Sequence, residues 1–158
     1  MSSPPRVDAG IPAVPGRHEH GPAAPRARVV VTDHDPAFLE LLQELLADEG
    51  YAAAVPPDLR DPYPFIRAQR PDLVVLDLVY REEAGLLTVL DLLRLDPATA
   101  ATPVLVCTTT PGALDGLHGR QAEGLYVLTK PFGLDQLLTH LAAILAAHPP
   151  GRAAAGRA

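Results

Sequence analysis

Short, nearly continuous hydrophobic runs alternate with longer amphipathic stretches along most of this chain. The runs "RVVV", "YAAAV", "DLVVL", "PVLVC" and "LYVLT" are short, apolar and mostly rich in β-branched residues, so we expect each to form a strand, the first of them buried. Strands that are hydrophobic at successive positions are covered on both faces, as in parallel sheets packed between helices. The pattern therefore predicts an α/β protein with five strands.

The stretches between these runs predict helices. In "PAFLELLQELLADEG", apolar residues recur at helical spacing and Gly50 is a natural stop. The face they predict comprises Phe38, Leu41, Leu42, Leu45 and Leu46. The stretch "PPDLRDPYPFIRAQR" allows only a short helix, because Pro62 and Pro64 are tolerated in a first turn and nowhere later.

Three further helices are expected, over 84–95, within 110–122 and over 133–147. The last has a clear apolar stripe formed by Leu134, Leu137, Leu138, Leu141 and Leu145. The segment 110–122 contains Gly112, Gly116 and Gly119, and each interior glycine costs about 1 kcal/mol relative to alanine. We expect that helix to be short or mobile.

Right-handed crossovers leave few arrangements for such a chain. The common five-stranded one is the doubly wound, flavodoxin-like parallel sheet with strand order 2-1-3-4-5. We expect this sheet, flanked by five helices, in one domain over residues 27–147. Residues 1–26 and 148–158 are rich in Pro, Ala, Gly and Arg, and we expect disordered tails there. The "HEH" at 18–20 is interpreted as solvated tail rather than a metal site.

Charge and cysteine content restrict the partners. Residues 29–148 hold 7 basic and 17 acidic residues, and the resulting net negative charge repels nucleic-acid phosphate. The single cysteine, Cys107, excludes a disulfide framework, suits a reducing compartment and is interpreted as a small buried hydrophobe. No apolar run is long enough to span a bilayer. We expect a soluble cytoplasmic protein with no nucleic-acid and no membrane partner.

Chemically active residues follow four of the five strands. They are Asp33, His34 and Asp35 after the first strand, Asp77 after the third, Thr108 after the fourth and Lys130 after the fifth. In doubly wound sheets ligands bind at the carboxyl ends of the strands, so these groups should converge on one rim.

Such a group of residues suits phosphoryl transfer. One carboxylate can attack phosphorus and become an acyl phosphate, and a second nearby anion recruits Mg²⁺. A hydroxyl and a lysine can then hold the equatorial oxygens of the moving group. The residues that fit these roles are Asp77, Asp33, Thr108 and Lys130. The simpler interpretation, a structural ion pair between Asp77 and Lys130, is disfavoured by Thr108 at matching spacing.

The stretches "VVVTDHDP", "PDLVVLDL", "PVLVCTT" and "LTKPF", with Gly85 eight residues after Asp77, closely resemble the receiver domain of bacterial two-component response regulators. The resemblance covers about residues 27–147. It implies that Asp77 is the phosphoacceptor and that Asp33 and Asp77, with the backbone carbonyl of Val79, bind Mg²⁺. It also implies that Thr108 is the switch hydroxyl and that Lys130 is the family's lysine ahead of a proline.

The resemblance further implies partners and a role. A sensor histidine kinase or a phosphotransfer protein would load Asp77 in a phosphorelay, and the protein would not itself be an enzyme. No output domain follows in the sequence, so we expect a single-domain regulator; whether it forms a homodimer is left open.

This chain departs from the family at several positions. The family usually has two adjacent acids where Asp33 and His34 stand, and imidazole is a poor ligand for Mg²⁺ and a better one for Zn²⁺ or Mn²⁺-like ions. We therefore expect a weakened Mg²⁺ site. Asp35, immediately before Pro36, is interpreted as a helix N-cap. Further departures are Arg81 for a frequent proline, Thr109 for a small residue, and Val127 at the aromatic switch position, one residue after Tyr126.

Two alternatives remain open from the sequence. The first is a degenerate pseudo-receiver that binds a partner without phosphorylation, which His34 and Val127 favour and intact Asp77 disfavours. The second is a haloacid-dehalogenase-like phosphatase, because "DHD" satisfies that family's Asp-x-Asp after the first strand. That family also needs an acidic motif after the lysine, where only Asp135 is found, at an ordinary capping-region position.

Overall fold

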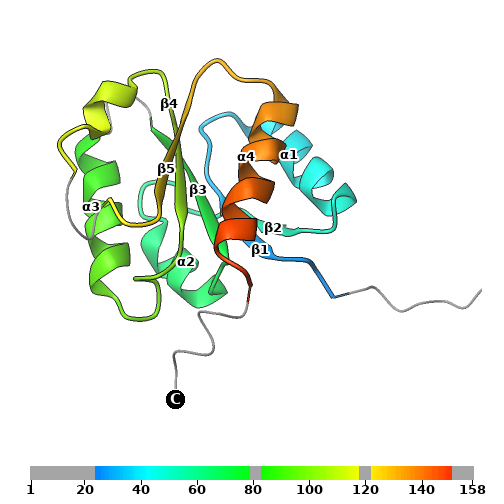
Figure 1. Ribbon diagram of the computed structural model, residues 1–158, viewed down its shortest axis with the longest axis horizontal. Coiled ribbons are helices and arrows are strands. Elements are labelled where there is room, and N and C mark those ends of the chain that lie inside the picture. The colour runs from blue at the N-terminus through cyan, green and yellow to red at the C-terminus, as the bar shows by residue number, and fades with distance from the viewer. Residues whose placement is uncertain (1–23, 79–82, 118–121, 151–158) are drawn as a thin grey trace, which may run out of the picture.

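The computed structural model describes residues 24–78, 83–117 and 122–150. Within them, five parallel strands form one sheet of order β2-β1-β3-β4-β5 (Figure 1). The strands are β1 (Arg28–Val31), β2 (Ala52–Ala54), β3 (Leu73–Leu78), β4 (Val104–Thr108) and β5 (Leu125–Thr129). The predicted flavodoxin-like sheet and its strand order are confirmed.

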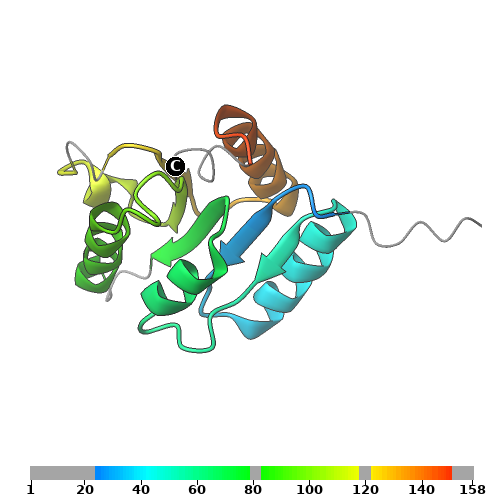
Figure 2. The same ribbon diagram turned by 90° about the horizontal axis from the view of Figure 1, so that it is seen from below.

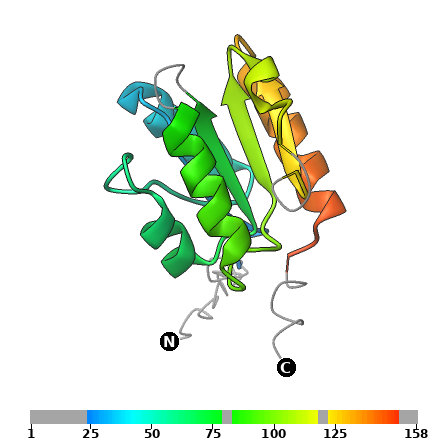
Figure 3. The ribbon, with the colours of Figure 1, turned by 90° about the vertical axis from the view of Figure 1, so that its left-hand side faces the viewer.

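Four α-helices cover the two faces of the sheet. They are α1 (Pro36–Asp48), α2 (Tyr63–Gln69), α3 (Glu83–Leu95) and α4 (Leu134–Ala147). Helices α1 and α4 lie on one face and α2 and α3 on the other, as Figures 2 and 3 show. All five strands run in the same direction, so their carboxyl ends share one edge.

Alternate residues of the three central strands, β1, β3 and β4, belong to two separate cores. On β3, Leu73 and Val75 pack with α1 and α4, whereas Val74 and Leu76 pack with α2 and α3. All four side chains are buried. A strand buried on both faces needs apolar residues at every position, and this explains the continuous runs in the sequence.

Local chemistry fixes where α1 begins and ends. The carboxylate of Asp35 accepts hydrogen bonds from the N–H groups of Ala37 and Phe38, and Pro36 occupies the first helical position. Gly50, just beyond the helix, has φ of +86°, a conformation that glycine adopts without the steric cost other residues meet. The predicted cap and stop are confirmed.

Two helical predictions need correction. Between β4 and β5 the described residues contain only a short 3₁₀ helix, Pro111–Leu114, instead of a fifth α-helix, so the expectation of a short element there holds. On α1, Leu41 is 44% exposed and Leu39 is buried in its place. The prediction is wrong at Leu41, but Leu42 and Leu46 of the predicted face are buried and Phe38 packs against the same core.

Most of both expected tails lies outside the described residues. At the boundaries, the N–H of Arg26 donates to the carbonyl of Gly50 at 2.8 Å. His148 Nε2 lies 2.8 Å from the hydroxyl of Tyr126. Arg26 and His148, which the sequence analysis assigned to the tails, are thus hydrogen-bonded to the domain.

Candidate functional site

Asp77 stands one residue before the end of β3, at the edge where the strands end. The side chain is only 4% exposed, and its two carboxylate oxygens have different partners. Oδ1 forms an ion pair with Nζ of Lys130, and Oδ2 lies 2.7 Å from Nδ1 of His34. The sequence placed Asp77 after the strand; in the structure it is part of β3, paired in register with Cys107 of β4.

Lys130 reaches Asp77 because the segment after β5 is held at both sides. The N–H of Lys130 donates to the carbonyl of Thr108 at 2.7 Å, which extends the β4–β5 pairing by one residue. Two residues further on, the Phe132 ring meets the Phe38 ring of α1 edge to face, with 6.5 Å between centroids. The predicted convergence of Lys130 and Asp77 is confirmed.

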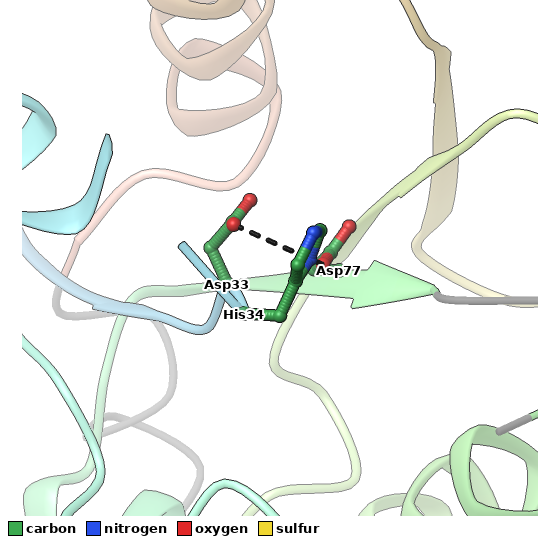
Figure 4. A group of neighbouring side chains, drawn as sticks. All are labelled: Asp33, His34 and Asp77. Atoms are coloured by element: carbon green, nitrogen blue, oxygen red, sulfur yellow. Dashed lines mark hydrogen bonds and ion pairs between the residues drawn. The ribbon is translucent and has the colours of Figure 1, made fainter. Parts of the chain in front are cut away.

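Asp33 and His34 belong to the turn between β1 and α1. Asp33 is buried, and its Oδ1 accepts a hydrogen bond of 2.8 Å from the N–H of Asp35. His34 is 67% exposed, and its Nδ1 lies 3.5 Å from Asp33 Oδ1. Figure 4 shows the side chains of Asp33, His34 and Asp77 directed toward one another.

These contacts change the acidity of two groups. The hydrogen bond to Asp77 raises the pKa of His34 above its usual 6.5, because the carboxylate favours the imidazolium form. Burial raises the pKa of Asp33 above its usual value, the hydrogen bond from Asp35 opposes that rise, and the charge of Asp77 adds to it. Asp33 is thus a carboxylate whose negative charge is poorly solvated.

Thr108 is brought to the same edge, and its hydroxyl is hydrogen-bonded to Thr110. The residue is fully buried, and Oγ1 accepts a hydrogen bond of 3.0 Å from the N–H of Thr110. The hydroxyl of Thr110 lies 3.4 Å from it. Among the described residues, the hydrogen-bond partner of this hydroxyl is therefore Thr110.

Two residues near Asp77 were not anticipated from the sequence. Thr32 accepts a hydrogen bond of 3.1 Å from the N–H of Asp77 and its hydroxyl lies 3.3 Å from the carbonyl of Val75, so it ties β1 to the end of β3. Arg60 lines a cavity of about 250 Å³ whose wall also includes Asp77 and Gly85. The hydroxyl directly before Asp33 was a usable signal for Thr32; the loop around Arg60 gave none.

Other predicted positions are placed as follows. Val79, the expected carbonyl ligand, and Arg81 lie outside the described residues. Val127 is 37% exposed on the edge strand β5, and the hydroxyl of neighbouring Tyr126 bonds His148. Cys107 is buried, and burial raises the pKa of its thiol to about 12, in keeping with the interpretation as a small hydrophobe.

The donor atoms present match Mg²⁺ only in part. Mg²⁺ takes oxygen ligands in near-octahedral geometry. Asp33, His34 and Asp77 each offer one donor atom, and these three atoms lie within 4.8 Å of one another. Two of the donors are carboxylate oxygens, but the third is the imidazole nitrogen of His34. A nitrogen donor at that place does not suit Mg²⁺.

Comparisons with known proteins identify related sequences. The family model described as the response regulator receiver domain matches residues 29–142. The transcriptional regulatory protein TcrX of Mycobacterium tuberculosis, described as probable, is 33% identical over 117 residues. The DNA-binding regulator RpaA of Synechocystis is 32% identical over 124 residues. These matches cover 74% and 75% of this chain but 49% and 48% of the relatives, so the chain spans about half their length.

Solved structures show the same fold. The receiver domain of a LuxO-type repressor protein from Vibrio parahaemolyticus superposes with a TM-score of 0.63 at 25% identity, covering 78% of this chain and 92% of that one. The chemotaxis protein CheY4 of Vibrio cholerae gives 0.60 at 22% identity, covering 75% and 98%. Among the described helices, none has the length and apolarity needed to cross a membrane.

Proposed function

This chain belongs to the response regulator receiver family, and on that premise we propose that Asp77 accepts a phosphoryl group in two-component signalling. The donor would be the phosphohistidine of a sensor histidine kinase or a phosphotransfer protein. The observation that carries the proposal is the pairing of a buried Asp77 carboxylate with Lys130 at the strand-end edge. A structural ion pair at this edge would need neither the Thr108 hydroxyl on the next strand nor the cavity beside Asp77.

The transfer follows from the charges around Asp77. A carboxylate oxygen of Asp77 attacks phosphorus, the bond between phosphorus and the donor's imidazole nitrogen breaks, and that nitrogen keeps the electron pair. Lys130, already paired with Asp77, would shift to the incoming phosphoryl oxygens and neutralise their charge. The hydroxyl of Thr108 would turn from Thr110 toward the new phosphoryl group, which is how the modified state could be communicated to the segment after β4.

The finer features of the role are part of the same proposal. Asp77 is a stoichiometric acceptor, so the protein acts as a signalling module and not as an enzyme with turnover. We propose that it acts as a single-domain regulator in the cytoplasm, where phosphohistidine donors and a reduced Cys107 are both expected. We propose that Mg²⁺ binds weakly, because His34 stands where the family usually has an acid.

A second candidate is a receiver-shaped interaction module that works without phosphorylation. The favouring observation is that His34 already occupies Oδ2 of Asp77, the oxygen that Lys130 leaves available. An acceptor whose two oxygens are both engaged must exchange a partner before it can react. This candidate predicts partner binding that is unchanged when Asp77 is replaced by Asn.

The deciding experiment is intact-mass measurement after incubation with acetyl phosphate and Mg²⁺. We expect the parent to gain one phosphoryl group and Asp77→Asn to gain none. Asp135→Asn, an exposed position in the first turn of α4, is the matched control and should behave like the parent. No gain by the parent supports the interaction module. Gain by Asp77→Asn but not by Asp33→Asn would instead support the phosphatase-like alternative.

A further inference from the structure

We propose that Asp33, His34 and Asp77 form a binding site that prefers a borderline transition-metal cation, Zn²⁺ in the first place, over Mg²⁺. Each residue offers one donor atom, and all three atoms lie within 4.8 Å of one another. This inference goes beyond phosphoryl acceptance, because it concerns which ion the edge binds whether or not Asp77 is ever phosphorylated.

The distances from His34 to the two carboxylates are close to what such an ion requires. Zn²⁺ lies about 2.0–2.2 Å from nitrogen and oxygen ligands, so donors in tetrahedral or octahedral arrangement are roughly 3.0–3.4 Å apart. Nδ1 of His34 lies 3.5 Å from Oδ1 of Asp33 and 2.7 Å from Oδ2 of Asp77. Movements of a few tenths of an ångström in the exposed His34 ring bring both of its distances into that range. The donor oxygens of Asp33 and Asp77 lie within 4.8 Å of each other and would draw together around the ion.

The two carboxylates are already oriented by neighbouring groups. Oδ1 of Asp33 accepts the N–H of Asp35, and Asp35 is itself fixed as the N-cap of α1. The second oxygen of Asp77 is held by Lys130, and the N–H of Asp77 is bound to Thr32. Partners of this kind fix ligand orientation in protein metal sites and contribute strongly to metal affinity.

Charge and exposure complete the site. The side chains of Asp33 and Asp77 are 9% and 4% exposed, so two carboxylates with little access to water face one ammonium, that of Lys130. A divalent cation would offset the remaining negative charge. His34 is 67% exposed and lies on the solvent side, which leaves outer coordination positions open to water.

The imidazole decides which cation is preferred. Mg²⁺ demands oxygen ligands, releases its waters reluctantly and gains little from nitrogen. Imidazole suits Zn²⁺, Cu²⁺, Ni²⁺ and Fe²⁺, and carboxylates complete mixed nitrogen–oxygen sites for them. The presence of His34 in place of an acid therefore shifts the selectivity of the site toward Zn²⁺, in addition to weakening its affinity for Mg²⁺.

The test is calorimetric titration of the full chain with Zn²⁺ in buffer that contains a thousandfold excess of Mg²⁺, together with NMR signals of the histidine rings. We expect one equivalent of Zn²⁺ to bind and to shift the His34 ring signals. His34→Ala should weaken Zn²⁺ binding at least tenfold, and His34→Asp should weaken Zn²⁺ while tightening Mg²⁺. His140→Ala, on the exposed side of α4, is the matched control and should bind like the parent.

The tail histidines require a second control, because His18 and His20 could bind Zn²⁺ by themselves. A His18→Ala/His20→Ala chain should keep the affinity of the parent. Zn²⁺ binding that is lost in this chain, that is unchanged in His34→Ala, or that Mg²⁺ displaces would each overturn the proposal. Since binding is read from heat and ring signals, its failure is distinguishable from a failure of Asp77 to gain a phosphoryl group.

Discussion

Nδ1 of His34 lies 2.7 Å from Oδ2 of Asp77, although the two residues are 43 positions apart in the chain. The contact arises because the turn after β1 and the end of β3 share one edge of the sheet. It puts an imidazole against the oxygen that Lys130 does not hold. The proposed phosphoacceptor Asp77 and the proposed metal donor His34 are thereby in direct contact.

This contact should make stability depend on pH. Asp77 raises the pKa of His34 above 6.5, so the protonated pair stabilises the fold fully below pH 6.5 and loses that contribution as pH rises through the raised value. The melting temperature of the parent minus that of His34→Gln should be positive at pH 5.5 and shrink toward pH 8. Because His34 is mostly exposed, the effect should be below about 1 kcal/mol.

His140→Gln is the control for this pH series. His140 is exposed on α4, and its Nδ1 bonds a carbonyl of its own helix rather than a carboxylate. A His34→Gln difference that stays constant between pH 5.5 and 8 would show that the charged pair with Asp77 does not form in solution.

Thr32→Val should destabilise the domain through the backbone of Asp77. The hydroxyl of Thr32 accepts the Asp77 N–H, and valine leaves that largely buried donor without a partner, at a cost of roughly 1–3 kcal/mol. Urea denaturation measures this loss in the free energy of unfolding. Thr139→Val on the exposed face of α4 is the same chemical change and should stay within about 0.5 kcal/mol of the parent. Equal effects of the two substitutions would refute the structural role of Thr32.

Cys107 should be unreactive in the folded chain. It is 4% exposed with a thiol pKa of about 12, so thiolate at pH 8 is on the order of one part in ten thousand. A thiol reagent such as DTNB should label one cysteine per chain only after unfolding in guanidinium. Because the pKa of the thiol is near its ordinary value of 9 in the unfolded chain and near 12 in the folded one, the free energy of unfolding should also fall across that pH range. Fast labelling at pH 8 would show that β4 opens.

The fold was predictable because a central strand that is buried on both faces of the sheet has apolar residues at nearly every position. Parallel strands bring their carboxyl ends together, so the meeting of Asp33, Asp77 and Lys130 followed from topology alone. The direction of each side chain did not follow. The Thr108 hydroxyl is bound by Thr110, and His34 turns to Asp77, because local hydrogen bonds choose among rotamers that the sequence pattern leaves equal.

The helical errors have a similar origin. Leu39 and Leu41 lie on either side of the apolar face of α1, and contact with the sheet buries Leu39 and leaves Leu41 exposed. The segment after β4 lacks a fifth α-helix among the described residues, because glycines weaken its helix propensity and packing does not compensate. In both segments the local sequence pattern was compatible with more than one structure, and tertiary contacts determined which one formed.

The 3₁₀ segment should be the least protected helical region. Residues 111–117 include Gly112 and Gly116 and are mostly exposed, whereas α4 buries Leu137, Leu141, Ile144 and Leu145. Amide hydrogen exchange should therefore be faster by orders of magnitude in 111–117 than in 137–145. Similar protection in the two segments would mean that packing overrides the glycines and would remove the case for a mobile face after β4.

His34→Asp gives the sharpest test of the site, because its two effects have opposite signs. Without metal, the new carboxylate would join Asp33 and Asp77 at one edge, and their repulsion should lower stability. A close pair of unit charges is worth a few kcal/mol at an effective dielectric near 20, and exposure at position 34 reduces this to about 1 kcal/mol. With Mg²⁺, the restored acidic pair should bind the ion more tightly and raise the melting temperature above the gain of the parent.

Thermal melts with and without Mg²⁺, run on the parent, His34→Asp and His34→Asn, separate these effects. His34→Asn is close in size to His34→Asp but uncharged, so it should show neither the loss that carboxylate repulsion causes without metal nor the larger gain with Mg²⁺. Phosphorylation of Asp77 by acetyl phosphate should be faster in His34→Asp, because a bound cation neutralises the charge of the arriving phosphoryl group. If His34→Asp melts no lower without metal and gains no more from Mg²⁺ than His34→Asn, position 34 lies outside the coordination sphere. The interaction-module function would then be favoured over phosphoryl acceptance.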